Sequence, residues 1–176
     1  MADAEQVEIR RLTAAGVHDE LDALAAVLAD CVEGGASVGY MAPFSHAEAR
    51  EVFEAYAGDA EQGRRIILGA FLEDQLVGTA QLVTGLPPNQ PHRADVARVL
   101  VHRSARKRGI AQRLMDRLEQ EARAEGKTLL VLDAVTGGDA ARLYERLGWT
   151  TLGVIPNYAL YPDGRFCDTT VFWKSL

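Results

Sequence analysis

The stretch SARKRGIAQRLM, residues 104–115, gathers basic residues around one glycine and then becomes apolar. Its basic residues are Arg106, Lys107, Arg108 and Arg113. Alternating apolar residues over 95–101 predict a strand before this stretch. An apolar face predicts a helix over residues 110–124 after it, and that face consists of Leu114, Met115, Leu118 and Ala122. The stretch is therefore predicted to turn a strand directly into the start of a helix.

Such a bend suits a small polyanion. The first turn of a helix exposes unpaired backbone N–H groups and carries a partial positive charge. Gly109 lets a ligand approach the backbone without a Cβ in the way, and Ala111 keeps the first turn small. With basic side chains around them, these features favour a pyrophosphate. The chain has neither the GxxxxGKS/T pattern of ATP-binding loops nor the GxGxxG pattern of dinucleotide-binding folds. The alternative is a basic turn that simply stays solvated.

The bulk composition narrows the class of protein. A chain of 176 residues fits one domain with a real core, so residues 1–176 are predicted to form a single domain. A formal net charge of -6 argues against nucleic acid or an anionic membrane as partner. Cys31 and Cys167 stand far apart without metal-ligand spacing, which favours a reducing cytoplasm and no metal. The N-terminus lacks the apolar stretch of a signal peptide, and no apolar run is long enough to span a bilayer.

The remaining pattern predicts a layered domain. Strands are predicted over residues 7–12, 64–72, 76–84, 95–101, 128–134, 150–155 and 169–174, and helices over 17–32, 45–56, 110–124 and 139–147. Ser45 and Glu48 form a capping box at the start of the second helix. A hairpin followed by a strand–helix–strand unit predicts an α/β or α+β layered domain, with a mixed, mostly antiparallel central sheet and helices on both faces.

The bend also resembles a known motif. Arg106-Lys107-Arg108-Gly109-Ile110-Ala111 is similar to the Q/R-x-x-G-x-G/A motif of the GCN5-related N-acetyltransferase (GNAT) family, and the predicted element order matches across nearly the whole chain. GGASVGYM at residues 34–41, the region 93–115 and PDGR at residues 162–165 look similar to the tabtoxin-resistance type of acetyltransferase. The resemblance implies a GNAT-like acyl-CoA N-acyltransferase fold and direct transfer of acetyl from acetyl-CoA to an amine.

The resemblance also implies where acetyl-CoA lies. Its pyrophosphate is expected on backbone amides of the bend, and its pantetheine arm is expected to pair with the strand before the bend, like an added strand. The cofactor-binding residues implied are Val99, Leu100, Val101, Arg106, Lys107, Arg108, Gly109, Ile110, Ala111, Gln112, Asp133, Arg142 and Tyr144.

Three residues are candidates for proton transfer. Tyr144 fits the family pattern Y-x-x-x-G-F/W, whose tyrosine is often placed to protonate the leaving thiolate; a tyrosine that only packs its ring is the alternative. Asp95 stands where several members carry a catalytic glutamate, and its shorter side chain favours a water relay. His92 is the second candidate for the base. Asp95 paired with Arg93 or Arg98 is the structural alternative.

The acceptor site is expected beside the glycine-rich loop at residues 33–44. Ser37, Tyr40 and Met41 in this loop, with Asp95, are predicted to contact the acceptor, and a flexible connector between helices is the alternative. Tyr158, predicted in a loop before the last strand, would close the other side. We therefore expect a small-molecule primary amine as acceptor, amino-acid-, toxin- or antibiotic-like. A protein or peptide acceptor and a non-catalytic CoA-binding sensor are the alternatives. Members of the family are often dimers, so a homodimer is compatible with the resemblance.

Overall fold

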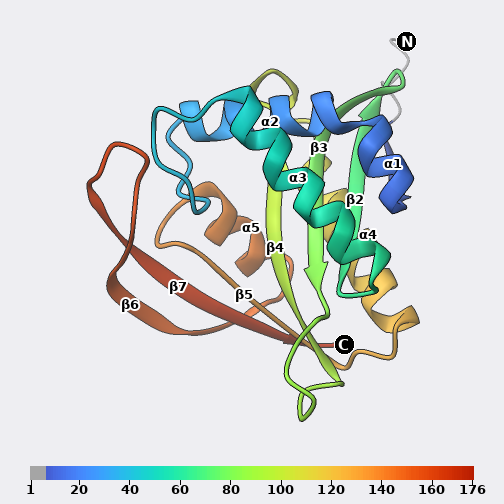
Figure 1. The fold of residues 1–176 in the computed structure, drawn as a ribbon. Helices are drawn as coiled ribbons and strands as arrows, with labels where there is room; N and C mark the ends of the chain where they lie inside the picture. The colour runs from blue at the N-terminus through green and yellow to red at the C-terminus, as the bar shows by residue number, and fades with distance from the viewer. Residues whose placement is uncertain (1–6) are drawn as a thin grey trace, which may run out of the picture.

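The computed structural model describes residues 7–176, and its centre is one seven-stranded sheet in the order β1-β2-β3-β4-β5-β7-β6 (Figure 1). The strands are β1 (Glu8–Leu12), β2 (Arg65–Leu72), β3 (Gln75–Val83), β4 (Arg93–Val101), β5 (Leu129–Val135), β6 (Thr150–Leu160) and β7 (Phe166–Ser175). Neighbouring strands are antiparallel except β4 and β5, which are parallel. The predicted mixed, mostly antiparallel sheet is confirmed.

Helices cover both faces of this sheet, as predicted (Figure 1). They are α1 (Ala14–Asp19), α2 (Leu21–Glu33), α3 (His46–Glu61), α4 (Ile110–Ala124) and α5 (Asp139–Arg146), with a short 3₁₀ helix, η1 (Arg103–Ala105), before α4. The three N-terminal helices bury one core, which includes Leu24, Leu28, Phe53, Ile67 and Leu100. The helices α4 and α5 bury the other, which includes Leu68, Leu114, Leu118, Tyr144 and Phe172.

Several predicted boundaries differ from the structure: α3 runs on to Glu61 and β7 begins at Phe166, and two further differences have a clear cause. The helix predicted over residues 17–32 is two helices, because the chain turns at Glu20, which buries Val17 and Leu21 in the same core. The strand predicted over 150–155 continues to Leu160. Pro156 and Asn157 hide this continuation in the sequence, and the structure absorbs them as a register shift between Ile155 and Ala159.

The parallel strands β4 and β5 separate after a short paired stretch. Their register joins residues 93–95 to residues 129–131 and ends there. Beyond this point β5 runs on beside β7, while β4 runs on beside β3 towards the bend (Figure 1). The facing edges of both strands are therefore left without a strand between them, next to the start of α4.

A β-bulge interrupts β4 at the same level. Arg98 has a left-handed backbone with φ 53, and Arg98 and Val99 together lie opposite one residue of β3. Before the bulge, Val96 packs into the core under α4; after it, Val99 and Val101 do so. The bulge therefore shifts the alternation by one residue and directs Arg98 to the face covered by α3.

No helix within residues 7–176 combines the length and the apolar character needed to cross a bilayer. The predicted absence of a signal peptide rests partly on residues 1–6, which lie outside the described residues.

Candidate active site

The start of α4 is an open set of backbone donors. Gly109 occupies the N-cap with φ 74, and no side chain caps the helix. The first backbone bond of the helix runs from Arg113 N to Gly109 O, so the amides of Ile110, Ala111 and Gln112 have no intrahelical acceptor. A Cβ added to Gly109 would meet no protein atom within 4 Å. These uncapped donors fit the pyrophosphate of acetyl-CoA, because they offer several N–H groups and the positive end of a helix to one anion.

The basic side chains of the bend do not all face this set of donors. The Arg106 guanidinium turns back to the end of β4, donating from Nε to the Val101 carbonyl at 3.1 Å. Arg113 donates to the Val7 carbonyl, on the other side of the helix. Lys107 and Arg108 are exposed, and a hollow of about 190 Å³ beside Arg108 adjoins the bend. The charge around the helix start therefore comes from Lys107 and Arg108.

Tyr144, on α5, presents a buried ring with a reachable hydroxyl. Its ring packs against Trp149 and Phe172, with centroids 6.0 and 5.9 Å away, and the residue is 5% exposed. Among the described residues, no group makes a hydrogen bond with the Tyr144 hydroxyl. Its oxygen atom is also not fully buried. The hydroxyl therefore keeps contact with solvent. Burial raises the pKa of the Tyr144 phenol, and the nearby Asp133 carboxylate raises it further.

Asp133 lies on β5, just beyond the point where this strand separates from β4. Its neighbours Leu132 and Ala134 pack into the core under α4, so Asp133 lies on the opposite face, and its side chain stays open to solvent. Partial desolvation raises the pKa of the Asp133 carboxyl; the Arg98 guanidinium opposes this rise and the Asp95 carboxylate adds to it. Asp133 therefore interacts electrostatically with Arg98, with Asp95 and with the Tyr144 hydroxyl.

The two predicted bases differ in their surroundings. Asp95 lies where β4 and β5 last pair, and its carboxylate makes an ion pair with Arg93, one of the two partners foreseen for it. His92 is exposed just before β4, and its carbonyl accepts the Thr128 amide at 2.8 Å. His92 stands three residues before Asp95 on an extended chain, about 10 Å further from the strand separation. Its ring makes no hydrogen bond or ion pair within the described residues.

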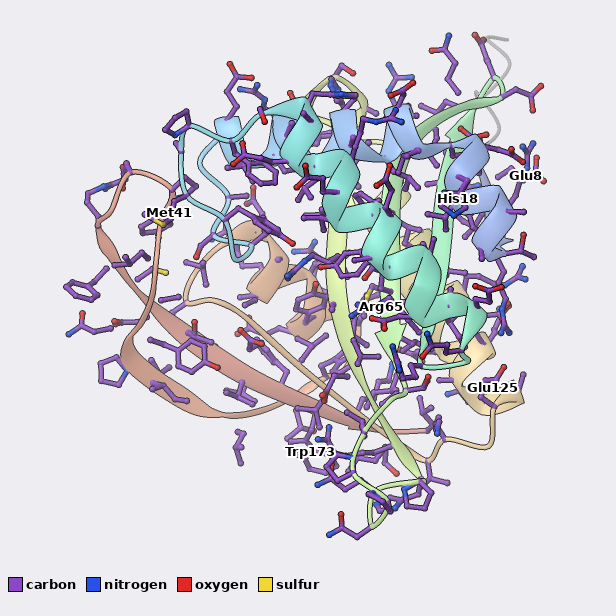
Figure 2. All side chains as sticks on the ribbon, viewed as in Figure 1. Glu8, His18, Met41, Arg65, Glu125 and Trp173 are labelled. Atoms are coloured by element: carbon purple, nitrogen blue, oxygen red, sulfur yellow. The ribbon has the colours of Figure 1, made fainter. Side chains whose placement is uncertain are left out.

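The glycine-rich loop between α2 and α3 is tied to the β6–β7 hairpin. The Ser37 hydroxyl donates to the Leu160 carbonyl at 2.7 Å, and the Ala42 amide donates to the Pro162 carbonyl at 3.0 Å. Met41, 46% exposed, lies beside the hairpin (Figure 2). Tyr158 is 56% exposed and belongs to β6, where a loop was predicted. Loop and hairpin therefore form one continuous wall.

Behind this wall lies a cluster that the sequence did not reveal. Arg98 donates from Nε to the Tyr56 hydroxyl at 3.2 Å, and that hydroxyl lies 3.3 Å from the Tyr40 hydroxyl. The guanidinium carbon of Arg98 is 5.4 Å from the centre of the Tyr40 ring. Only the bulge in β4 brings Arg98 here, and no local motif marks a bulge.

Arg142, one of the predicted cofactor residues, lies on α5. Its guanidinium folds back onto the start of its own helix, donating to the Gly137 carbonyl and to Asp139. The other predicted cofactor residues lie on β4, at the bend or beside the strand separation, with Val99 unpaired in the register of the sheet.

The sequence model of the acetyltransferase (GNAT) family matches residues 30–149. A curated relative from Azospirillum brasilense, an N-acetyltransferase encoded in the hisH-hisA intergenic region, is 35% identical over 136 residues and covers 76% of each chain.

Solved structures share the fold. The ribosomal-protein-alanine N-acetyltransferase from Brucella melitensis superposes with a TM-score of 0.81 at 25% identity, over 96% of this chain and 99% of that one. An acetyltransferase from Salmonella typhimurium, solved with its cofactor acetyl-CoA, superposes with a TM-score of 0.79 at 21% identity, over 97% and 94% of the two chains.

Proposed function

The chain belongs to the acetyltransferase (GNAT) family, and on that premise we propose that it transfers acetyl from acetyl-CoA directly to the primary amine of a small molecule. Residues 1–176 would act as a single N-acetyltransferase domain. The observation that carries the proposal is the meeting of three features at the separation of β4 and β5: the uncapped start of α4, the Tyr144 hydroxyl and the Asp133 carboxylate.

Acetyl-CoA supplies an activated acetyl thioester, and the bend is proposed to hold it. The amides of Ile110, Ala111 and Gln112 would receive the pyrophosphate, with Gly109 leaving the approach open and Lys107 adding charge. The free edge of β4 offers backbone partners to the amide-bearing arm. The Val101 carbonyl already accepts the Arg106 side chain, so that residue must share its carbonyl or release Arg106.

The acceptor must lose a proton before its nitrogen can attack. A base works best when its pKa approaches the working pH, and the raised pKa of Asp133 moves it in that direction. Asp95 is already paired with Arg93, although its charge helps to raise the pKa of Asp133. We therefore favour Asp133 as the group that takes the amine proton, directly or through water. Asp95 and His92 remain the rival predictions.

Tyr144 is proposed to supply the proton to the departing sulfur from its hydroxyl. A phenol with its ordinary pKa of about 10 already carries its proton at neutral pH, and the raised pKa of Tyr144 does not change this, so the proton is in place before the reaction starts. The packed ring fixes its direction without occupying the hydroxyl itself.

The wall over the acceptor side favours a small molecule. The α2–α3 loop and the β6–β7 hairpin are bonded to each other at Ser37 and Ala42, which restricts the room for a folded protein partner. A protein N-terminus is the second candidate, because the Brucella melitensis relative is an N-acetyltransferase of a ribosomal protein. Tyr40, Met41 and Tyr158 are proposed to line the site. The likeness to the tabtoxin-resistance type, the cytoplasmic location and a homodimer stay predictions.

Release of CoA, measured with a thiol reagent, tests the proposal. Purified protein is mixed with acetyl-CoA and a panel of small primary amines, and a second panel holds peptides with free N-termini. We expect release with small amines, with the acetylated product confirmed by mass spectrometry. Release with peptides alone would favour the protein acceptor. Binding of acetyl-CoA without release by any amine would contradict the proposal and favour a CoA-binding sensor.

A further inference from the structure

We infer that the acceptor is an amine that also carries a carboxylate, as a free amino acid does, and that Arg98 binds this carboxylate. The inference rests on the proposed function and narrows its substrate class. It also separates the two acceptor candidates, since the amine of a protein N-terminus has no free carboxylate next to it.

The first step is the charge of Arg98. The residue is half-buried, and among residues 7–176 no carboxylate lies within ion-pair distance of its guanidinium. Other half-buried arginines nearby are neutralised: Arg65 pairs with Asp59, and Arg93 pairs with Asp95. Partial burial of an unpaired cation is unfavourable, and such groups concentrate at functional sites.

The second step is how firmly Arg98 is held. The Tyr56 hydroxyl accepts its Nε at 3.2 Å, and the Tyr40 ring lies 5.4 Å from its guanidinium carbon. Gly39 packs so close that an added Cβ would lie 3.3 Å from one Arg98 terminal nitrogen. These contacts occupy Nε, one face of the guanidinium and the side of one terminal nitrogen next to Gly39, and the remaining N–H groups are the ones we assign to the ligand. Two such parallel N–H groups match the two oxygens of a carboxylate.

The third step is the placement opposite Asp133. Arg98 is close enough to Asp133 to influence its pKa, and the two residues sit on different strands at the point where β4 and β5 separate. A zwitterionic acceptor has the complementary pair of charges. Its ammonium would face Asp133, which takes the proton, and its carboxylate would face Arg98. The bulge in β4 places Arg98 on the face covered by α3 for this contact, which gives a reason for its left-handed backbone.

Paired acceptors test the inference. Each common L-amino acid is compared with its α-amide, which keeps the amine and side chain but removes the carboxylate charge. We expect Arg98→Gln to lower kcat/KM for the free acids roughly 100-fold, because a charge-assisted, two-point contact is lost. At a pH above the acid limb, the same variant should change kcat/KM for the amides less than about 3-fold. The ratio of variant to wild type is taken for each acceptor, so differences in amine pKa cancel.

Two further variants control for folding. Arg98→Lys keeps the charge at the same left-handed position and loses only the two-point geometry, so it should retain part of the preference for free acids. Arg10→Gln removes a guanidinium on β1, away from the site, which lies 4.3 Å from the centre of the Phe71 ring on β2. It should leave both acceptor classes unchanged. Equal losses for acids and amides in both Arg98 variants would overturn the inference and leave the proposed function intact.

A binding measurement keeps the inference testable if no amino acid is turned over. The Tm of the CoA-saturated protein is measured with increasing concentrations of each free amino acid and each amide. We expect free acids, and not amides, to raise the Tm of the wild type, and Arg98→Gln to abolish the rise. If acids bind in this way but no amine releases CoA, the proposed function fails while the carboxylate site stands. Absence of both turnover and binding by free acids would overturn the carboxylate site.

Discussion

The Ser37 hydroxyl donates to the Leu160 carbonyl at 2.7 Å and so joins two segments that lie 123 residues apart in the chain. Cys167 approaches the same hydroxyl, with its Sγ 3.5 Å from Ser37 Oγ. Ser37 therefore links the α2–α3 loop to both strands of the β6–β7 hairpin. This bond joins the α2–α3 loop and the β6–β7 hairpin into one unit, although the two segments lie far apart in the chain.

Replacing Ser37 with alanine should loosen that wall. We expect Ser37→Ala to raise the KM for the acceptor several-fold, because one net hydrogen bond contributes about 1 kcal/mol to holding the loop. The Kd of acetyl-CoA should not change, since the bend is elsewhere. Steady-state kinetics and calorimetric titration measure the two constants. Ser175→Ala is the control, because this exposed hydroxyl makes no hydrogen bond among the described residues. An unchanged acceptor KM in Ser37→Ala would contradict the role of the bond.

The glycine at the start of α4 should matter more to acetyl-CoA than the charges around it. Gly109→Val places a branched side chain at φ 74 and fills the space in front of the helix amides. We expect calorimetric titration to show a loss of acetyl-CoA affinity of at least about 100-fold, the value of several charge-assisted bonds. Lys107→Ala should weaken binding only several-fold, since an exposed charge contributes about 1 kcal/mol or less.

Gly126→Val separates backbone strain from ligand contact. Gly126 follows α4 with φ 71, and a Cβ there also meets nothing within 4 Å. Both valine variants should lose similar stability in thermal unfolding, and only Gly109→Val should lose acetyl-CoA. If Lys107→Ala weakened binding as much as Gly109→Val, the charge and not the helix start would hold the ligand.

The bend was predictable because every signal for it is local. A strand pattern, a glycine and an amphipathic pattern follow one another over residues 95–124, and the structure contains the corresponding strand, left-handed Gly109 and α4. The order of strands and helices along the chain was predictable for the same reason. The positions of the basic side chains were not predictable. Arg106 and Arg113 donate to backbone carbonyls whose positions are set only in the folded chain.

The local sequence does not determine the positions of Arg98 and Ser37. A bulge depends on how β4 pairs with β3, so nothing in the sequence around Arg98 announces it. Ser37 was predicted to contact the acceptor, which stays a prediction, and the bond from its hydroxyl to the Leu160 carbonyl was not predictable. The continuation of β6 through Pro156 likewise depends on the neighbouring β7. These features are set by pairing between distant segments.

Tyr144→Phe should separate chemistry from packing. Phenylalanine keeps the ring contacts with Trp149 and Phe172, and no protein hydrogen bond to the hydroxyl is lost among the described residues. We expect the free energy of unfolding to change by less than about 0.5 kcal/mol. The kcat should fall about 100-fold or more if the hydroxyl supplies the proton. An unchanged kcat at saturating substrates would leave Tyr144 with a packing role only.

The acid limb of the pH–rate profile should identify the base. If Asp133 takes the proton, kcat/KM falls as pH drops through its pKa, which lies above the ordinary value of about 3.9. Asp95→Asn removes a negative neighbour and should move this limb to lower pH. Arg98→Gln removes a positive neighbour and should move it to higher pH, measured with an α-amide acceptor that does not use the carboxylate contact. An acid limb that disappears in Asp95→Asn and persists in Asp133→Asn would make Asp95 the base.

The same raised pKa predicts a gain in stability for Asp133→Asn. A folded-state pKa above the unfolded value means that the folded protein binds this proton more tightly than the unfolded chain does. The wild type therefore loses stability as pH rises from about 3.9 through the folded-state pKa, whereas asparagine does not titrate. Thermal unfolding at pH 7 should give Asp133→Asn a higher Tm than the wild type, and the difference should shrink towards about pH 3, where the carboxyl is protonated in both states. Asp163→Asn is the opposite control: its pKa is lowered by hydrogen bonds from Arg165, so removing that carboxylate should not stabilise the protein. A lower Tm for Asp133→Asn at pH 7 would mean that the folded protein favours the charged carboxylate, and the argument for Asp133 as a tuned base would fail.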